Sequence, residues 1–199
     1  MSAKTRALGG GAAVLLAAGL GAGPAMAAPA AREAANAPNA AKATSATCSR
    51  AKRPGRVVVV RGMPTTTRAT ARALLGAGVR CDAAALTKRA ERDKTRLSFG
   101  IVTAKEFFAL PEKETKYRYL VDALVKARPG YDKTSHDYVW PRLAAGDAYL
   151  DRSAWDEAVA AGLLTKAQAA QMRRDGTGYL GWRLAISDRG EWRFFIAGD

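Results

Sequence analysis

The C-terminal residues 177–199 show the clearest alternation of apolar and polar positions in the chain. Two apolar-rich runs flank the loop 188–190, which has a length typical of a tight β-hairpin. Gly190 suits the left-handed position that closes a three-residue loop, because a side chain there would be strained. Pairing Ser187 with Glu191 then predicts the register of both strands.

This register divides the hairpin into two faces, because side chains alternate along a strand. The apolar face holds Trp182, Leu184, Ile186, Trp192, Phe194 and Ile196, and the other face holds Arg183, Ala185, Glu191, Arg193 and Phe195. On the second face Arg183 falls opposite Phe195, with Arg193 diagonal to it. That arrangement favours a cation–π contact or a small platform for a sugar or a base. We therefore take Arg183, Arg193 and Phe195 as candidate binding residues.

The most regular helical spacing of apolar residues begins after Pro111 and stops at Pro129 and Gly130. A bare hairpin is marginally stable at best, so its apolar face needs a cover from elsewhere in the chain. We expect this helix to supply the cover. Its apolar stripe consists of Tyr117, Leu120, Val121, Leu124 and Val125.

Shorter patterns predict the remaining elements. The β-branched run 56–61 and the alternating run 96–102 favour strands, whereas 131–150 is aromatic but irregular and favours a loop with short helical pieces. Helix starts are indicated by Thr65–Thr67, Asp82, Thr103 with Glu106, Ser153, and Thr165 with Gln168, and a helix end by Gly76 and Gly78.

Strands grouped with helices, without regular β-α alternation, predict an α+β fold. We expect a single small domain over residues 56–199. In it the C-terminal antiparallel β-hairpin and one or two further strands pack on several short helices.

The N-terminal residues 1–27 read as a secretory signal peptide, with a basic start, a short apolar core over 12–21 and an A-x-A site that predicts cleavage after Ala27. The apolar core is too short to span a bilayer, and no transmembrane segment is expected later in the chain. Residues 28–55 are rich in alanine and proline and predict a flexible basic leader. These features indicate a secreted, extracellular protein.

The net charge of +14 is concentrated in one part of the chain. Residues 28–96 hold fifteen basic and four acidic side chains, whereas 97–199 hold fifteen and fourteen. Such a positive field attracts anionic polymers and weakens with salt. Lys52, Arg53 and Arg56 are therefore candidate binding residues, with a merely solvated surface as the alternative.

Cys48 and Cys81 are the two cysteines of the chain. In an exported protein such a pair predicts one disulfide, which would contribute roughly 3–4 kcal/mol on the chain-entropy model. Two free or intermolecular thiols are the alternative.

Few residues suggest catalysis or a cofactor. His136, the one histidine, stands between Ser135 and Asp137, but three adjacent residues do not form a catalytic triad. One histidine and two cysteines do not fill a zinc site, and no phosphate-binding loop occurs, so we expect no metal and no cofactor.

Acidic and aromatic residues gather within 131–157 and leave a carboxylate-pair mechanism open. They are Asp132, Asp137, Asp147 and Asp151 beside Tyr131, Tyr138, Trp140 and Tyr149. A secreted, glycosidase-like hydrolase is the alternative function. It would require two of these acids to converge in a cleft with an aromatic wall.

Two short helices over 153–161 and 165–174, followed by the hairpin, resemble the layout of a winged helix-turn-helix domain. Residues 145–178, however, carry a net charge of −1, whereas a phosphate-binding surface should be positive. We expect no specific DNA recognition. The preferred prediction is an exported, non-catalytic binding or cell-surface-associated protein, whose basic N-terminal region associates with an anionic envelope polymer or another polyanion.

Overall fold

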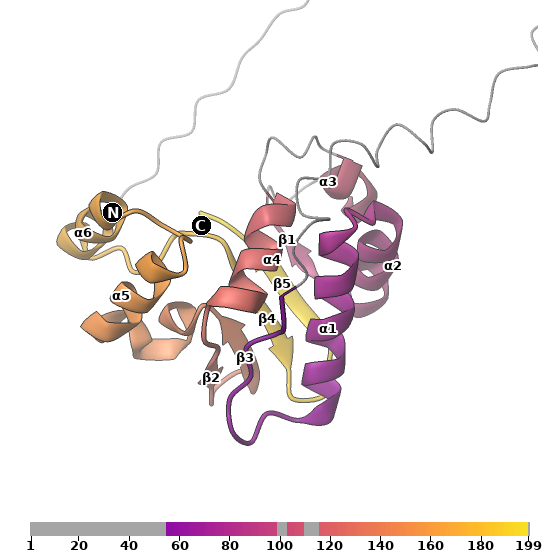
Figure 1. Cartoon of the computed structure of the whole chain (residues 1–199), viewed down its shortest axis with the longest axis horizontal. Helices are drawn as coiled ribbons and strands as arrows, with labels where there is room; N and C mark the ends of the chain where they lie inside the picture. Colours follow the sequence, from indigo (N-terminus) through magenta and orange to yellow (C-terminus); the bar gives the residue numbers. More distant parts are fainter. Residues whose placement is uncertain (1–54, 99–102, 110–115, 199) are drawn as a thin grey trace, which may run out of the picture. The chain divides into compact units, whose positions relative to one another are not determined.

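The computed structural model describes residues 55–98, 103–109 and 116–198, all within the unit Ala37–Asp199 (Figure 1). The predicted signal peptide over 1–27 and nearly all of the predicted leader therefore lie outside the described residues.

The described residues form an α+β domain, as predicted. The helices are α1 (Thr65–Val79), α2 (Ala83–Asp93), α3 (Ala104–Ala109), α4 (Lys116–Lys126), α5 (Arg152–Ala160) and α6 (Lys166–Asp175), with short 3-10 turns η2 (Arg142–Ala144) and η3 (Gly146–Leu150). The strands are β1 (Arg96–Leu97), β2 (Gly130–Asp132), β3 (Asp137–Trp140), β4 (Arg183–Ser187) and β5 (Trp192–Ile196).

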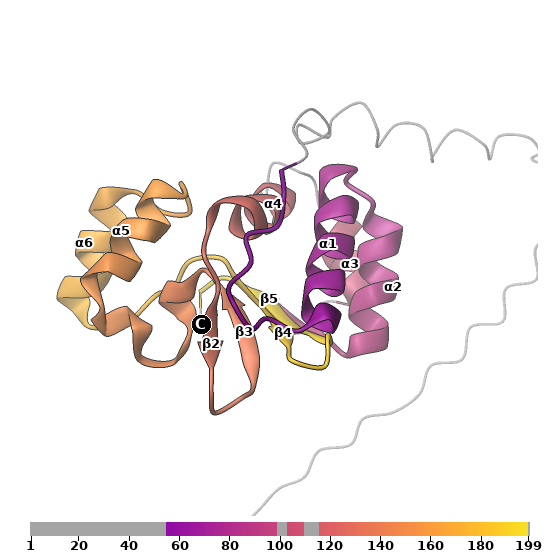
Figure 2. The ribbon, with the colours of Figure 1, turned by 60° about the horizontal axis from the view of Figure 1, so that its bottom comes forward.

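The strands form one mixed sheet in the order β1-β5-β4-β3-β2. β1 runs parallel to β5, and the other neighbours are antiparallel. The predicted hairpin is therefore the centre of the sheet. Helices α1 and α4 pack on each other and against β4. Figure 1 shows both helices in front of the strands, and Figure 2 shows the same arrangement in a turned view.

The predicted register of the hairpin is confirmed beside the loop but is wrong further from it. Ser187 N donates to Glu191 O, and Ile186 pairs with Trp192, both as predicted. A β-bulge then follows: Ala185 pairs with Phe194, so Arg193 is the extra residue of β5. The bulge exchanges the faces of every later β5 residue.

The exchange moves Phe195 into the core and Phe194 out of it. Phe195 pairs with Leu184 and is 0% exposed. Phe194 is half-buried on the other face, against a small cluster that includes Val139 and Ala185. The predicted outer-face position of Phe195 was therefore wrong.

Helix α4 covers the hairpin as predicted, with Tyr117, Leu120, Val121 and Leu124 buried. The predicted end of α1 at its glycines was wrong, because the helix continues to Val79. Gly78 instead permits close packing: a Cβ there would lie 3.1 Å from Val121 and 3.3 Å from Leu120. Glycine at this position lets α1 and α4 approach each other.

The predicted threonine cap of α1 was also wrong, because Pro64 occupies the N-cap and no side chain caps the helix. Three threonine hydroxyls of α1 donate instead to carbonyl oxygens of the hairpin loop. The pairs are Thr66 to Asp188 at 2.8 Å, Thr67 to Ser187 at 2.8 Å and Thr70 to Gly190 at 2.6 Å. Gly190 has a φ of 88°, and a Cβ there would lie 3.0 Å from the Thr66 carbonyl. Helix α1 thus anchors the loop.

The run 56–61 is not a strand, contrary to the prediction. It lies beside α4, where Val58 N donates to Leu124 O at 2.8 Å, and it pairs with none of the strands in the described part of the chain. The predicted strand over 96–102 is present as Arg96–Leu97, and 99–102 lie outside the described residues. Irregular structure was predicted over 131–150, where β2 and β3 in fact extend the sheet.

Three of the predicted side-chain caps are confirmed, and that of α5 is not. Asp82 accepts from Ala85 N at 2.9 Å, and the boxes of Thr103 with Glu106 and of Thr165 with Gln168 are present. The cap of α5 is Asp151 rather than Ser153: its carboxylate accepts from Ser153 N.

Candidate functional site: a charged hollow beside β5

A surface hollow of about 610 Å³ lies where α2 ends beside the bulged strand β5. Its lining combines four cationic side chains, three carboxylates and one aromatic ring. They are Arg92, Lys94, Arg96, Arg193, Asp93, Asp137, Glu191 and Phe194.

The backbone explains why these residues meet. Lys94 ends α2 in the left-handed conformation, with a φ of 53°, and so turns the chain into β1. Because β1 is parallel to β5, Arg96 pairs with Phe194. The bulge places Phe194 on the face away from the core, on which the hollow opens.

Asp93 holds the end of α2 to β5. Its carboxylate accepts from Trp192 N at 2.9 Å, Arg89 Nε at 2.5 Å and Arg92 Nε at 2.8 Å. Burial by itself would raise the pKa of Asp93, but the hydrogen bonds from Arg92, Trp192 and Arg89 outweigh it and hold the pKa below its ordinary value. The Asp93 carboxylate is therefore engaged in structural hydrogen bonds.

Asp137 is 4% exposed, and its Oδ1 accepts no hydrogen bond from a described residue. Arg193 pairs with Asp137, its Nε lying 3.8 Å from Oδ1, and its Nη1 lies 3.3 Å from Glu191 Oε2. Burial raises the pKa of Asp137, and the hydrogen bond from Ser135 and the charge of Arg193 offset this only in part. Arg193 therefore pairs with two carboxylates, those of Asp137 and Glu191.

Lys94 and Arg96 make no ion pair with any described residue. Both are exposed, and the Arg96 guanidinium carbon lies 5.8 Å from the centroid of the Phe194 ring. The hollow thus offers two uncompensated positive charges beside an aromatic ring. Chemically, it is suited to hold an anionic group.

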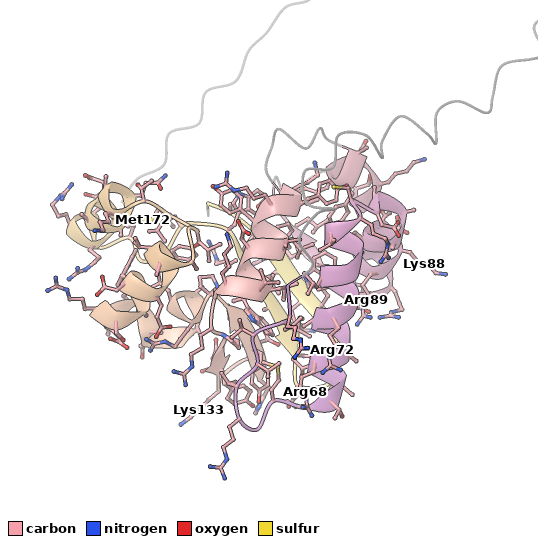
Figure 3. The ribbon with its side chains drawn as sticks, in the orientation of Figure 1. Arg68, Arg72, Lys88, Arg89, Lys133 and Met172 are labelled. Carbon is pink, nitrogen blue, oxygen red and sulfur yellow. The ribbon has the colours of Figure 1, made fainter. Side chains whose placement is uncertain are left out.

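Further basic side chains lie on the neighbouring helices. Figure 3 labels Arg68 and Arg72 on α1 and Lys88 and Arg89 on α2. Arg72 and Lys88 are exposed, whereas Arg89 is held by Asp93, Thr70 and the Gly190 carbonyl. The positive charge predicted for this part of the chain is therefore displayed on its surface helices as well as in the hollow.

The predicted platform of Arg183, Arg193 and Phe195 does not form. Phe195 faces the core, with its ring centroid 4.7 Å from that of Trp182. Arg183 pairs with Ile196, and its Nη1 donates to the carbonyls of Tyr179 and Gly181. Of the three residues, Arg193 alone lines the hollow.

The other candidate residues are only partly described. Arg56 is exposed, whereas Lys52 and Arg53 lie outside the described residues. No free cysteine occurs in the part of the chain that the structure describes. Cys48 lies outside that part, so its pairing with Cys81 stays a prediction.

Two of the four candidate acids of 131–157 are neighbours, because Asp132 pairs with Asp137 across β2 and β3. Only Asp137 lines the hollow. Asp132 accepts from Thr134 N in the β2–β3 turn, and Asp151 binds Arg142 and caps α5. Asp147 is exposed. The hollow therefore holds one of these four acids and offers no pair of them for a hydrolase mechanism.

His136, the one histidine of the chain, lies beside Tyr131. His136 Nδ1 lies 3.0 Å from the Tyr131 hydroxyl. Residues 55–98, 103–109 and 116–198 contain no cluster of three or more side chains able to ligate a metal ion.

Sequence reasoning missed Lys94, Arg96 and Phe194 as site residues. The charge concentration in 28–96 includes the first two but does not distinguish them from the other cations. Strict alternation assigns Phe194 to the core, because the bulge leaves no signal in the pattern of apolar positions.

The chain matches no protein-family model, no curated protein and no solved structure. Within the described residues, every helix is too short or too polar to cross a membrane.

Proposed function

We propose that this is an exported, non-catalytic binding protein that associates with an acidic polymer. The observation that carries the proposal is the pair of cations, Lys94 and Arg96, without an ion-pair partner among the described residues and beside Phe194. Both belong to the segment 28–96, which carries a net charge of +11. The hollow gives this basic segment a defined contact point.

The binding mode follows from the exposure of these charges. Exposed cations attract a polyanion over about one Debye length, roughly 8–10 Å at physiological salt. Each anionic group that they neutralise releases counterions, so affinity falls as salt rises. Basic residues of the N-terminal region, including Lys52, Arg53 and Arg56, extend the same attraction along a polymer.

Export predicts a specific mature chain. Intact-mass analysis of the exported protein should show loss of residues 1–27, and non-reducing peptide mapping should link Cys48 to Cys81 within one chain. A mature form that retains Met1 would contradict the proposed location. Free thiols on the native protein would contradict the disulfide.

Polymer association should depend on both salt and the hollow. The mature protein should be retained on an immobilised polyanion at low salt and released at high salt. The double variant Lys94→Gln/Arg96→Gln should weaken retention and reduce the slope of log affinity against log salt by about 2. The triple variant Lys52→Gln/Arg53→Gln/Arg56→Gln tests the N-terminal contribution in the same assay.

The matched control removes two charges far from the hollow in sequence. Lys166→Gln/Arg173→Gln changes exposed residues of α6 that make no ion pair with a described residue. This control should bind more tightly than the Lys94 and Arg96 variant. Retention that is insensitive to salt, or equal loss in both double variants, would refute the proposed role of the hollow.

A further inference from the structure

The hollow contains hydrogen-bond acceptors as well as cations. Asp93 is occupied by Arg89, Arg92 and the Trp192 amide. Asp137 and Glu191 remain, and they share the single guanidinium of Arg193. Asp137 and Glu191 therefore have one cation between them, which leaves acceptor capacity for a ligand.

The unpaired cations and the remaining carboxylates of the hollow are therefore suited to different ligand groups. Lys94 and Arg96 are suited to an anion. Glu191 is exposed and is suited to a hydrogen-bond donor, because an ionised carboxylate only accepts. Asp137 is 4% exposed, and its Oδ1 has no hydrogen-bond donor among the described residues, so it is a second acceptor in the lining.

This division disfavours a nucleic-acid backbone. A DNA phosphodiester chain presents acceptors and negative charge, so it would satisfy Lys94 and Arg96 but be repelled at Glu191. A sugar that carries both a carboxylate and hydroxyl groups supplies the anion and the donors together. The half-buried Phe194 ring lines the same hollow and offers an apolar surface, with a negative face suited to sugar C–H groups.

We propose that the hollow recognises an acidic saccharide of the uronate type, with its carboxylate at Lys94 and Arg96, a hydroxyl donating to Glu191 and its ring against Phe194. This inference rests on the proposed association with acidic polymers and narrows the polymer to a polysaccharide. Arg193 is a positioning residue that pairs with both Glu191 and Asp137.

The first test compares probes on the mature, full-length protein at one fixed salt concentration. The probes are polygalacturonate, single-stranded DNA of matched total charge, and neutral dextran. We expect polygalacturonate to bind at least about tenfold more tightly than DNA, as one charge-assisted hydrogen bond requires, and dextran to bind more weakly than either. DNA binding as tight as polygalacturonate binding would overturn the inference.

The second test uses Glu191→Ala, which separates recognition from simple electrostatics. If attraction were only electrostatic, loss of this negative charge would strengthen binding of both polyanions. If Glu191 accepts a sugar hydroxyl, the variant should lose about tenfold in affinity for polygalacturonate and lose none for DNA. The matched control is Asp156→Ala, because Asp156 is an exposed residue of α5 that makes no ion pair with a described residue.

The outcomes distinguish the two proposals. Absence of binding to both polyanions at low salt would refute the proposed function and this inference together. Equal binding of both polyanions, strengthened by Glu191→Ala, would leave polymer association intact and overturn the saccharide assignment. Thermal unfolding of Glu191→Ala shows whether any lost affinity reflects lost structure.

Discussion

Replacing Phe195 with alanine should lower the free energy of unfolding by about 3–5 kcal/mol. The side chain is 0% exposed, and its ring centroid lies 4.7 Å from that of Trp182, 6.2 Å from that of Phe107 and 6.3 Å from that of Trp192. Truncation would leave a cavity between the sheet and its helical cover. Chemical denaturation of the variant measures the effect directly.

The neighbouring residue provides a matched control. Phe194→Ala removes the same atoms from a half-buried ring on the opposite face, where the hollow opens. It should cost less than half as much, because fewer contacts are lost and the site is already open to water. A larger loss for Phe194→Ala would favour the unbulged register, in which Phe194 faces the core.

Replacing Asp93 with alanine should cost about 2–3 kcal/mol at neutral pH. The variant loses the acceptor of the Trp192 amide and the partner of Arg89 and Arg92. Solvent reaches Arg92, so that ion pair adds little of the total. Asp156→Ala should change stability by no more than about 0.5 kcal/mol.

The lowered pKa of Asp93 also predicts that its contribution to stability depends on pH. The folded state holds the pKa of Asp93 below its ordinary value, so the folded state binds fewer protons there than the unfolded state. The stabilisation is full above the ordinary aspartate pKa and is lost as pH falls through the lower, folded-state pKa. The stability gap between the wild-type protein and Asp93→Ala should therefore narrow in acid. A gap that widens in acid would contradict the role assigned to this carboxylate.

Local patterns alone were enough to predict several elements. The loop 188–190, the pairing of Ser187 with Glu191 and the apolar stripe of α4 depend on nearby residues, as do the caps by Asp82 and Thr165. Caps, tight turns and helical periodicity are satisfied within a few residues, so short stretches of sequence carry the information that predicts them.

Other features depend on partners distant in the chain. Thr66 and Thr67 read as helix caps, yet their hydroxyls donate to the hairpin loop about 120 residues away. Gly78 reads as a helix end, yet its lack of a side chain admits Leu120 and Val121 of α4. Neither role can be predicted from the local sequence, because each depends on contact with an element that is distant in the chain.

The hollow also depends on residues that are distant in the chain. The alternation of β5 predicts two faces, but the bulge at Arg193 decides which phenylalanine belongs to which face. The basic composition of 28–96 predicts attraction to anions, but the parallel pairing of β1 with β5 places Arg96 beside Phe194. Sequence by itself determined the α+β class, the hairpin and the sign of the charge. Tertiary structure decided the faces and the site, because strand pairing joins residues nearly a hundred positions apart.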